Sequence, residues 1–178
     1  MRTTATTPTG ALRTFGDDEV IVSKTDLRGR LTYVNDVFMR VSCMAEDELL
    51  GKPHNVIRHP EMPRALFALL WNEIQAGREV FAYVLNLAAD GVGYWVLAHV
   101  TPTFQHGSIV GYHSNRRLPG AAAVATVAPL YERLRAIEAR QDSPVEALAA
   151  STAALADELA ERVTTYDEFV WSLAGVLQ

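Results

Sequence analysis

Residues 80–115 constrain the fold most, because they contain three strand-like segments in direct succession. The segments cover residues 80–87, 94–103 and 108–115, and they are rich in β-branched and aromatic residues. Asp90-Gly91 separates the first two segments, and His106-Gly107 separates the second from the third. Strands joined by turns this short pair in antiparallel fashion. The sequence therefore predicts a three-stranded antiparallel meander.

The residues before this meander predict two more strands and a group of helices. Residues 20–22 and 31–34 are short strand-like runs around a turn at 26–29, which indicates a β-hairpin. Apolar residues in 36–51 follow helical spacing in short pieces, and a longer helix is expected between Pro63 and Gly77. We therefore predict an α+β fold in which a five-stranded antiparallel sheet has its helices on one side.

The two ends of the chain differ from this central part. Residues 1–16 are rich in Thr, Gly and Pro and lack a hydrophobic period, which indicates a flexible N-terminal arm. A sensory domain is expected at 17–118, a linker of small residues at 119–126, and a helical output or interaction segment at 127–178.

Two helices are predicted in this C-terminal segment. The first covers about 127–141, and the second begins at Ser143-Pro144-Val145-Glu146, a capping box with proline in the first turn. Apolar residues then recur every three or four positions from Val145 to Leu177, with Arg162 as a polar interruption. This apolar seam suits either packing against the domain or dimerisation.

Composition and missing motifs argue against several classes of protein. The net charge of −5 opposes nucleic-acid binding, and the single cysteine, Cys43, cannot form a disulfide within the chain. The N-terminus does not resemble a signal peptide, and no apolar run approaches the roughly 20 residues of a membrane span, so a cytoplasmic location is expected. Phosphate loops, nucleophile elbows, HExxH and CxxC are absent from the sequence, so we do not expect an enzyme.

The segment 51–63 concentrates polar side chains on a backbone stiffened by three prolines. It suits a nucleotide-like ligand, because Arg58 can grip a pyrophosphate, His59 can donate to a phosphate or ring carbonyl, and Glu61 can accept from ribose hydroxyls. Alternatively the segment is a capped loop in which Glu61 favours the start of the next helix and pairs with Arg58. Spacing alone does not separate these two interpretations.

Three residues outside this segment are further candidates. Trp71 lies among apolar residues of the longer predicted helix and suits either core packing or contact with a flat ligand. Asn86 and His99 lie on predicted strands, and alternation places His99 on the same face as Trp95. The five histidines show no metal-site spacing, but a haem bound through a single histidine requires none.

Several motifs together resemble the FAD-binding PAS domains of aerotaxis receptors. They are Thr25-Asp26-Leu27-Arg28-Gly29, Thr32-Tyr33-Val34-Asn35, Asp47-Glu48-Leu49-Leu50-Gly51, Pro53-His54-Asn55 with Arg58-His59-Pro60-Glu61-Met62-Pro63, and Tyr94-Trp95-Val96. The resemblance implies the PAS fold and a noncovalently bound FAD that reports redox state or oxygen supply. It implies a cofactor site formed by Asn35, Arg58, His59, Glu61, Trp71 and Asn86.

The resemblance also implies a role for some of these residues. Arg58 and His59 would hold phosphate, Trp71 would contact an aromatic ring, and Asn86 would bond to the polar edge of the isoalloxazine. His99 stands where the family has an amide, so it joins the candidate site and keeps haem open as an alternative cofactor.

We therefore expect a cytoplasmic FAD-binding PAS redox or oxygen sensor. The membrane anchor, HAMP domain and methyl-accepting signalling region of aerotaxis receptors are not recognised in this sequence. Its C-terminal helices are expected to pass the cofactor state to a signalling partner, such as a protein of the chemotaxis pathway, or to a second copy in a homodimer. The alternatives are a haem gas sensor with His59 or His99 as ligand, and a cofactor-free interaction module.

Overall fold

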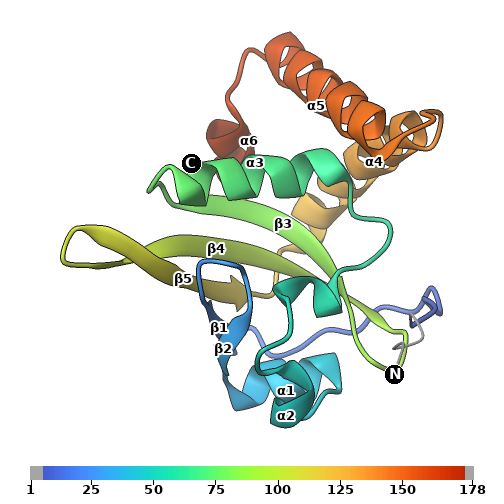
Figure 1. The fold of residues 1–178 in the computed structure, drawn as a ribbon. Helices are drawn as coiled ribbons and strands as arrows, with labels where there is room; N and C mark the ends of the chain where they lie inside the picture. The colour runs from blue at the N-terminus through green and yellow to red at the C-terminus, as the bar shows by residue number, and fades with distance from the viewer. Residues whose placement is uncertain (1–5, 175–178) are drawn as a thin grey trace.

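The computed structural model describes residues 6–174 and contains one five-stranded antiparallel sheet (Figure 1). The strands are β1 (Ile21–Thr25), β2 (Leu31–Val34), β3 (Val80–Leu87), β4 (Gly93–Gln105) and β5 (Ser108–Arg117). Their order across the sheet is β2-β1-β5-β4-β3. The predicted fold class is confirmed, and the N-terminal hairpin joins the meander through pairing of β1 with β5.

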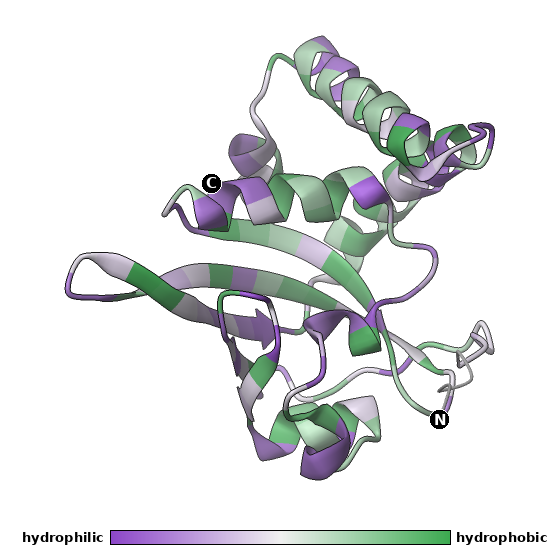
Figure 2. Ribbon diagram, in the orientation of Figure 1, coloured by the Kyte–Doolittle hydropathy of each residue, from purple (hydrophilic) through white to green (hydrophobic). Residues whose placement is uncertain are grey.

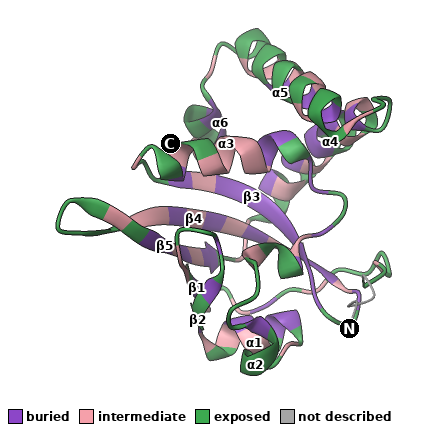
Figure 3. Ribbon diagram, viewed as in Figure 1, coloured by how far each residue is buried: buried purple, intermediate pink, exposed green. Residues whose placement is uncertain are grey.

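Three short helices and one longer helix connect the hairpin to the meander. They are α1 (Asp36–Ser42), α2 (Glu46–Leu49), the 3-10 helix η1 (His54–Ile57) and α3 (Arg64–Gln75). Asn35 caps α1, because its side chain accepts a hydrogen bond from the Phe38 amide. α3 begins directly after Pro63 and lies along β3, which is buried over most of its length (Figure 3). Among the described residues, no helix combines the length and apolar character that crossing a membrane requires.

The C-terminal segment forms three helices, which are α4 (Ala121–Glu138), α5 (Pro144–Glu161) and α6 (Tyr166–Leu173). α4 starts six residues before the expected position, because the small residues assigned to a linker are themselves good helix formers. α5 starts where its serine cap predicted, and the Ser143 side chain accepts from the Glu146 amide. The division into domains remains a prediction.

The apolar seam does not run through a single helix. The helix ends at Glu161, Val163 adopts a positive φ of 52°, and Thr165 with Glu168 forms a new capping box that starts α6. The sequence contains this second box, and its capping preference is stronger than the continuity of the apolar spacing. Leu177, the last seam residue, lies outside the described residues.

The described helices of this segment pack back on the domain. α5 buries Ala147, Ser151 and Leu155, whereas Val145 is exposed, and Figure 2 shows hydrophilic and hydrophobic residues alternating along it. α4 contacts the sheet face opposite α3, where the Tyr131 hydroxyl donates to the Tyr83 carbonyl at 2.8 Å. Dimerisation remains a prediction.

Residues 6–16 dock beside the β3–β4 turn, while the flexibility expected of the N-terminal arm remains a prediction. Backbone amides of Thr9 and Arg13 donate to the carbonyls of Gly91 and Gly93 at 2.8 and 2.9 Å, and Phe15 is buried. Because glycines near the β3–β4 turn have no side chains, another backbone segment can approach and hydrogen-bond to them. This explains why a segment without hydrophobic periodicity docks there.

Candidate ligand-binding cavity

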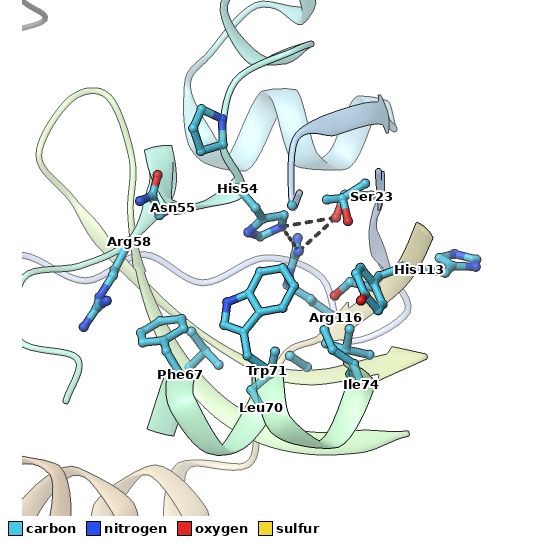
Figure 4. A pocket seen from close by; sticks show the side chains of 18 of the residues that line it. Ser23, His54, Asn55, Arg58, Phe67, Leu70, Trp71, Ile74, His113 and Arg116 are labelled. Atoms are coloured by element: carbon cyan, nitrogen blue, oxygen red, sulfur yellow. Dashed lines mark hydrogen bonds between the residues drawn. The ribbon is translucent and has the colours of Figure 1, made fainter. Parts of the chain in front are cut away.

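A cavity of about 220 Å³ lies between α3 and the sheet (Figure 4). Four side chains of α3 form one wall, and their spacing of three and four residues places them on one helical face. The opposite wall comes from alternate positions of β3 and β4. The apolar lining consists of Phe67, Leu70, Trp71, Ile74, Val84, Ala98 and Val100. The cavity therefore offers mainly apolar surface to a ligand.

Trp71 is fixed at the edge of this cavity by two neighbours. Its ring meets Tyr112 edge to face, with centroids 5.6 Å apart and planes at 87°. Gly29 has a φ of +73°, and a Cβ added there would lie 2.9 Å from Cη2 of Trp71. Only glycine adopts this backbone conformation easily and also leaves room for the indole.

The polar end of the cavity is formed by Ser23, His54 and Arg116. Nη2 of Arg116 donates to Oγ of Ser23 at 2.9 Å and to Nε2 of His54 (Figure 4). Arg116 is only 3% exposed, and no aspartate or glutamate lines the cavity. Burial lowers the pKa of Arg116 from 12.5 to about 10. The guanidinium is therefore a buried positive charge without a carboxylate partner in the cavity wall.

Burial and the charge of Arg116 together favour a neutral His54. Burial first, and then repulsion from Arg116, lower the pKa of His54 well below 6.5. Because a guanidinium can only donate, Nε2 of His54 must accept and the proton of the neutral ring must lie on Nδ1. His54 thus orients Arg116 without adding a second charge.

Four lining residues hold buried polar atoms that have no hydrogen-bond partner among the described residues. These atoms are Nδ2 of Asn86, Nε2 of His113, Oγ of Ser114 and Nη1 of Arg116. Such atoms are rare in folded proteins, because an unpaired buried donor costs about 1–3 kcal/mol. The atoms of Asn86, Ser114 and Arg116 could therefore pair with a ligand that carries hydrogen-bond acceptors.

Arg58 lies at another part of the lining. Its Nη2 donates to the Met62 carbonyl at 3.0 Å, and the guanidinium lies 4.1 Å from the centroid of the Phe67 ring. Its backbone bridges to Asn86 of β3, which holds the segment against the sheet. Arg58 therefore contributes a further positive charge to the lining, while Asn55 beside it is exposed.

Three of the residues predicted for the site lie near this region but do not line the cavity. Asn35 caps α1 and also bonds the backbone of β1 through Val22. His59 is buried, and its Nδ1 accepts from the Glu61 amide at 3.2 Å. The side chain of Glu61 is 75% exposed. These contacts hold the surrounding loops.

His99 is separated from the cavity by the sheet itself. Its neighbours on β4, Ala98 and Val100, line the cavity, so alternation directs His99 to the other face. There its Nε2 lies 2.8 Å from Oε2 of Glu79, and its ring stacks on Phe81 at 4.0 Å. Of the residues predicted for the site, the structure brings together Arg58, Trp71 and Asn86.

The polar end was not predicted from the sequence. On β5, Ser114 and Arg116 alternate with residues that face outward. An arginine on the buried face of this strand was therefore the sequence feature that could have indicated the site. His54 stands in the proline-rich segment, but its partner Arg116 is 62 residues away. Within residues 6–174 no cluster of three or more His, Cys, Asp or Glu side chains could hold a metal ion.

Comparison with known proteins agrees with this architecture. A family model described as PAS fold matches residues 19–113. The aerotaxis receptor of Escherichia coli (strain K12) is 41% identical over 122 residues, which are 68% of this chain and 24% of the receptor. The nitrogen fixation regulatory protein of Klebsiella pneumoniae is 26% identical over 99 residues, 55% of this chain and 20% of that protein. The chain thus spans about a quarter or less of these relatives.

Solved structures show the same fold. The dark structure of the blue-light photoreceptor Aureochrome1 LOV has a TM-score of 0.53 at 24% identity, over 66% of this chain and 86% of that one. A light-oxygen-voltage domain described with a flavin analogue has a TM-score of 0.55 at 16% identity, over 64% and 86%. At these identities the likeness concerns the fold alone.

Proposed function

Because this chain belongs to the PAS family, we propose that it is a redox or oxygen sensor that binds FAD in the cavity beneath α3. The similarity to the aerotaxis receptor and the light-oxygen-voltage fold support a sensory role and a flavin. The choice of FAD, the stimulus and the signalling partner are parts of the proposal. The expectation that the chain is not an enzyme and its cytoplasmic location remain predictions.

The observation that carries the proposal is the buried Arg116, which has no carboxylate partner in the cavity and retains an unpaired Nη1. A flavin ring has two apolar faces and one edge with carbonyl oxygens and ring nitrogens. Apolar walls around Trp71 suit the faces, and the donors of Asn86 and Arg116 suit the edge. When bound, flavin would supply reversible electron uptake, and a buried cation favours the added negative charge.

The cavity is large enough to enclose only part of FAD. Pockets that enclose a whole drug-sized ligand commonly measure about 300–1,000 Å³, whereas this cavity measures about 220 Å³. It is therefore suited to the ring, and the remainder of the dinucleotide would extend outside it. Arg58 is the lining cation that we assign to the phosphates.

The structure favours flavin over haem as the cofactor. The two residues expected as haem ligands were His59 and His99, and neither lines the cavity. His54 and His113 do line it, but Nε2 of His54 already accepts from Arg116, and the His113 ring points away from Trp71 (Figure 4). If the protein were a cofactor-free interaction module, the unpaired hydrogen-bond donors of the cavity would have no role.

In the proposed sensor, the C-terminal helices pass the cofactor state onward. β3 carries Asn86 on its cavity face and Tyr83 on the face that contacts α4, so one strand touches both parts. We propose that a change at the ring alters the packing of α4–α6, to which a chemotaxis protein or a second copy in a homodimer responds.

The proposal is tested by the absorption spectrum of the purified chain, followed by denaturation and identification of the released cofactor. We expect a flavin spectrum and released FAD. A Soret band establishes the haem alternative instead. A protein that stays colourless after incubation with FAD and with haem contradicts both cofactor assignments and supports the interaction module.

A further inference from the structure

Helix α3 is capped by a residue from another helix. Its N-cap position is Pro63, whose side chain cannot accept a hydrogen bond. Instead Oε1 of Glu138, at the C-terminal end of α4, accepts from the backbone N–H of Arg64 at 2.6 Å. The two residues are 74 positions apart. The first turn of α3 therefore depends on α4 for the acceptor that a local serine or aspartate usually supplies.

The environment of Glu138 makes this contact more than a surface ion pair. Its side chain is only 1% exposed, and Oε2 lies 3.1 Å from Nη1 of Arg135 in the same helix. A carboxylate at a helix N-terminus is stabilised by the helix dipole, and a charged acceptor strengthens the hydrogen bond. Buried carboxylates are costly unless they are paired in this way, so the pairing fixes α4 relative to α3.

Glu138 also belongs to the charge cluster around Arg58. Burial is the main cause that lowers the pKa of Arg58; Arg64 and Arg135 lower it further, whereas Glu138 raises it. Glu138 is thus the one carboxylate among these neighbours, and it offsets three guanidinium groups. Arg58 in turn lies over Phe67 of α3, the helix that Glu138 caps.

We infer that Glu138 is a positioning residue that couples helix α4 to the ligand cavity by capping α3 and balancing the charge at Arg58. The inference rests on the proposed function in one respect, which is that the ligand brings phosphate to Arg58. An anionic group there competes with Glu138 for the same cations. Because coupling free energies are reciprocal, a change at Glu138 must alter the affinity for the anionic ligand, and the ligand must alter the hold on α4.

The capping part is tested without any cofactor, by hydrogen exchange of the ligand-free protein. We expect Glu138→Ala to speed exchange of the Arg64 amide and of α4 by about tenfold or more, because a buried charged acceptor is lost. Glu138→Gln keeps an acceptor oxygen and should show a smaller change. Glu132→Ala, on an exposed position of α4, is the matched control and should exchange as the wild type does.

The coupling part is tested with three ligands that differ in phosphate content, FAD, FMN and riboflavin. Glu138→Gln leaves the cationic cluster with one negative charge fewer, so we expect FAD to bind about two- to tenfold more tightly while riboflavin is little changed. Equal effects on FAD and riboflavin contradict the coupling to Arg58.

The outcomes separate this inference from the proposed function. Unchanged exchange at Arg64 in Glu138→Ala overturns the inference, whatever the protein binds. If the wild type binds no flavin, the proposed function fails and the exchange measurement alone decides on the cap. If Glu138→Ala does not fold, the folded Glu138→Gln variant provides both readouts.

Discussion

The buried charge of Arg116 predicts that its replacement by methionine stabilises the ligand-free protein and weakens flavin binding. The two effects have opposite signs because the charge is unfavourable in the empty cavity and useful to a ligand. Methionine has a similar length and no charge, so Arg116→Met removes the guanidinium with little change in volume.

The magnitude follows from the environment of the guanidinium. Burial lowers the pKa of Arg116 from 12.5 to about 10, and at about 1.4 kcal/mol per pH unit this depression corresponds to about 3 kcal/mol. Methionine avoids that cost but loses the hydrogen bonds to Ser23 and His54 and the contact with the Phe38 ring, worth about 2 kcal/mol together. We therefore expect the free energy of unfolding to rise by about 1 kcal/mol.

The pH dependence of this penalty has a definite sign. The folded-state pKa lies below the unfolded value, so folding disfavours the charged form. The penalty is present in full at neutral pH, and it disappears only as the pH rises through about 10 toward 12.5. A comparison at pH 7 therefore measures the whole effect.

The assay is urea unfolding of the flavin-free protein together with titration by FAD. Arg117→Met is the matched control, because Arg117 is the next residue, is exposed and does not line the cavity beneath α3. We expect Arg117→Met to change stability by less than about 0.5 kcal/mol and to leave FAD affinity unchanged. Arg116→Met should weaken FAD binding by about tenfold or more, since it removes a charged donor.

Two results refute this reasoning. If Arg116→Met lowers the free energy of unfolding of the flavin-free protein by more than about 1 kcal/mol, the guanidinium is a net stabilising part of the core. If the variant binds FAD as the wild type does, Arg116 does not donate to the ligand, and the proposed function loses its main support.

Three further predictions concern residues around the cavity. The pKa of His54 is lowered well below 6.5, so the free energy of unfolding falls as the pH drops below about 6.5. In urea unfolding, His54→Gln should lessen this fall by up to about 1.4 kcal/mol per pH unit. An unchanged pH dependence of stability contradicts the assignment of a neutral, buried His54. Asn86→Ala should weaken FAD binding about tenfold, whereas His99→Ala, on the opposite sheet face, should leave the dissociation constant within about twofold. If His99→Ala weakens FAD binding more than Asn86→Ala does, FAD does not bind in the cavity beneath α3. Gly29→Ala should lower the free energy of unfolding by about 1–3 kcal/mol and alter the fluorescence of Trp71. If the variant has the stability and fluorescence spectrum of the wild type, the close contact between residue 29 and the Trp71 ring does not constrain either residue.

Local signals in the sequence predicted most of the fold. Glycine turns marked the meander, and the cap at Ser143 fixed the start of α5 because its hydrogen bond lies within four residues. The Thr165 capping box was equally local, but the continuous apolar spacing concealed it. The docking of residues 6–16 leaves no periodic signal in the sequence, because it depends on backbone groups of Gly91 and Gly93 rather than on a side-chain pattern.

The site was predictable only in part, because its two ends arise differently. Arg58 stands in a proline-stiffened segment, and Trp71 and Asn86 were identified through resemblance to a family. Arg116 meets Ser23 only because β1 pairs with β5, in a register that sets Ser23 opposite Ser114. A contact over 93 residues is a product of the tertiary fold, and composition or spacing carries no trace of it.

Two of the three arginines that line the cavity, Arg58 and Arg116, have different consequences for a sensor. Arg116 has no carboxylate partner in the cavity wall, so in the proposed sensor the ring itself relieves the unfavourable charge, which ties ligand affinity to the core. Arg58 already has a carboxylate nearby in Glu138, so a ligand there changes the balance of an existing contact. A ligand transmits a signal only if it interacts differently with two conformations. The ring reaches α4 through β3, whereas Arg58 reaches it through the contacts of Glu138. We therefore expect substitutions at Arg116 to alter binding and substitutions at Glu138 to alter both FAD affinity and transmission.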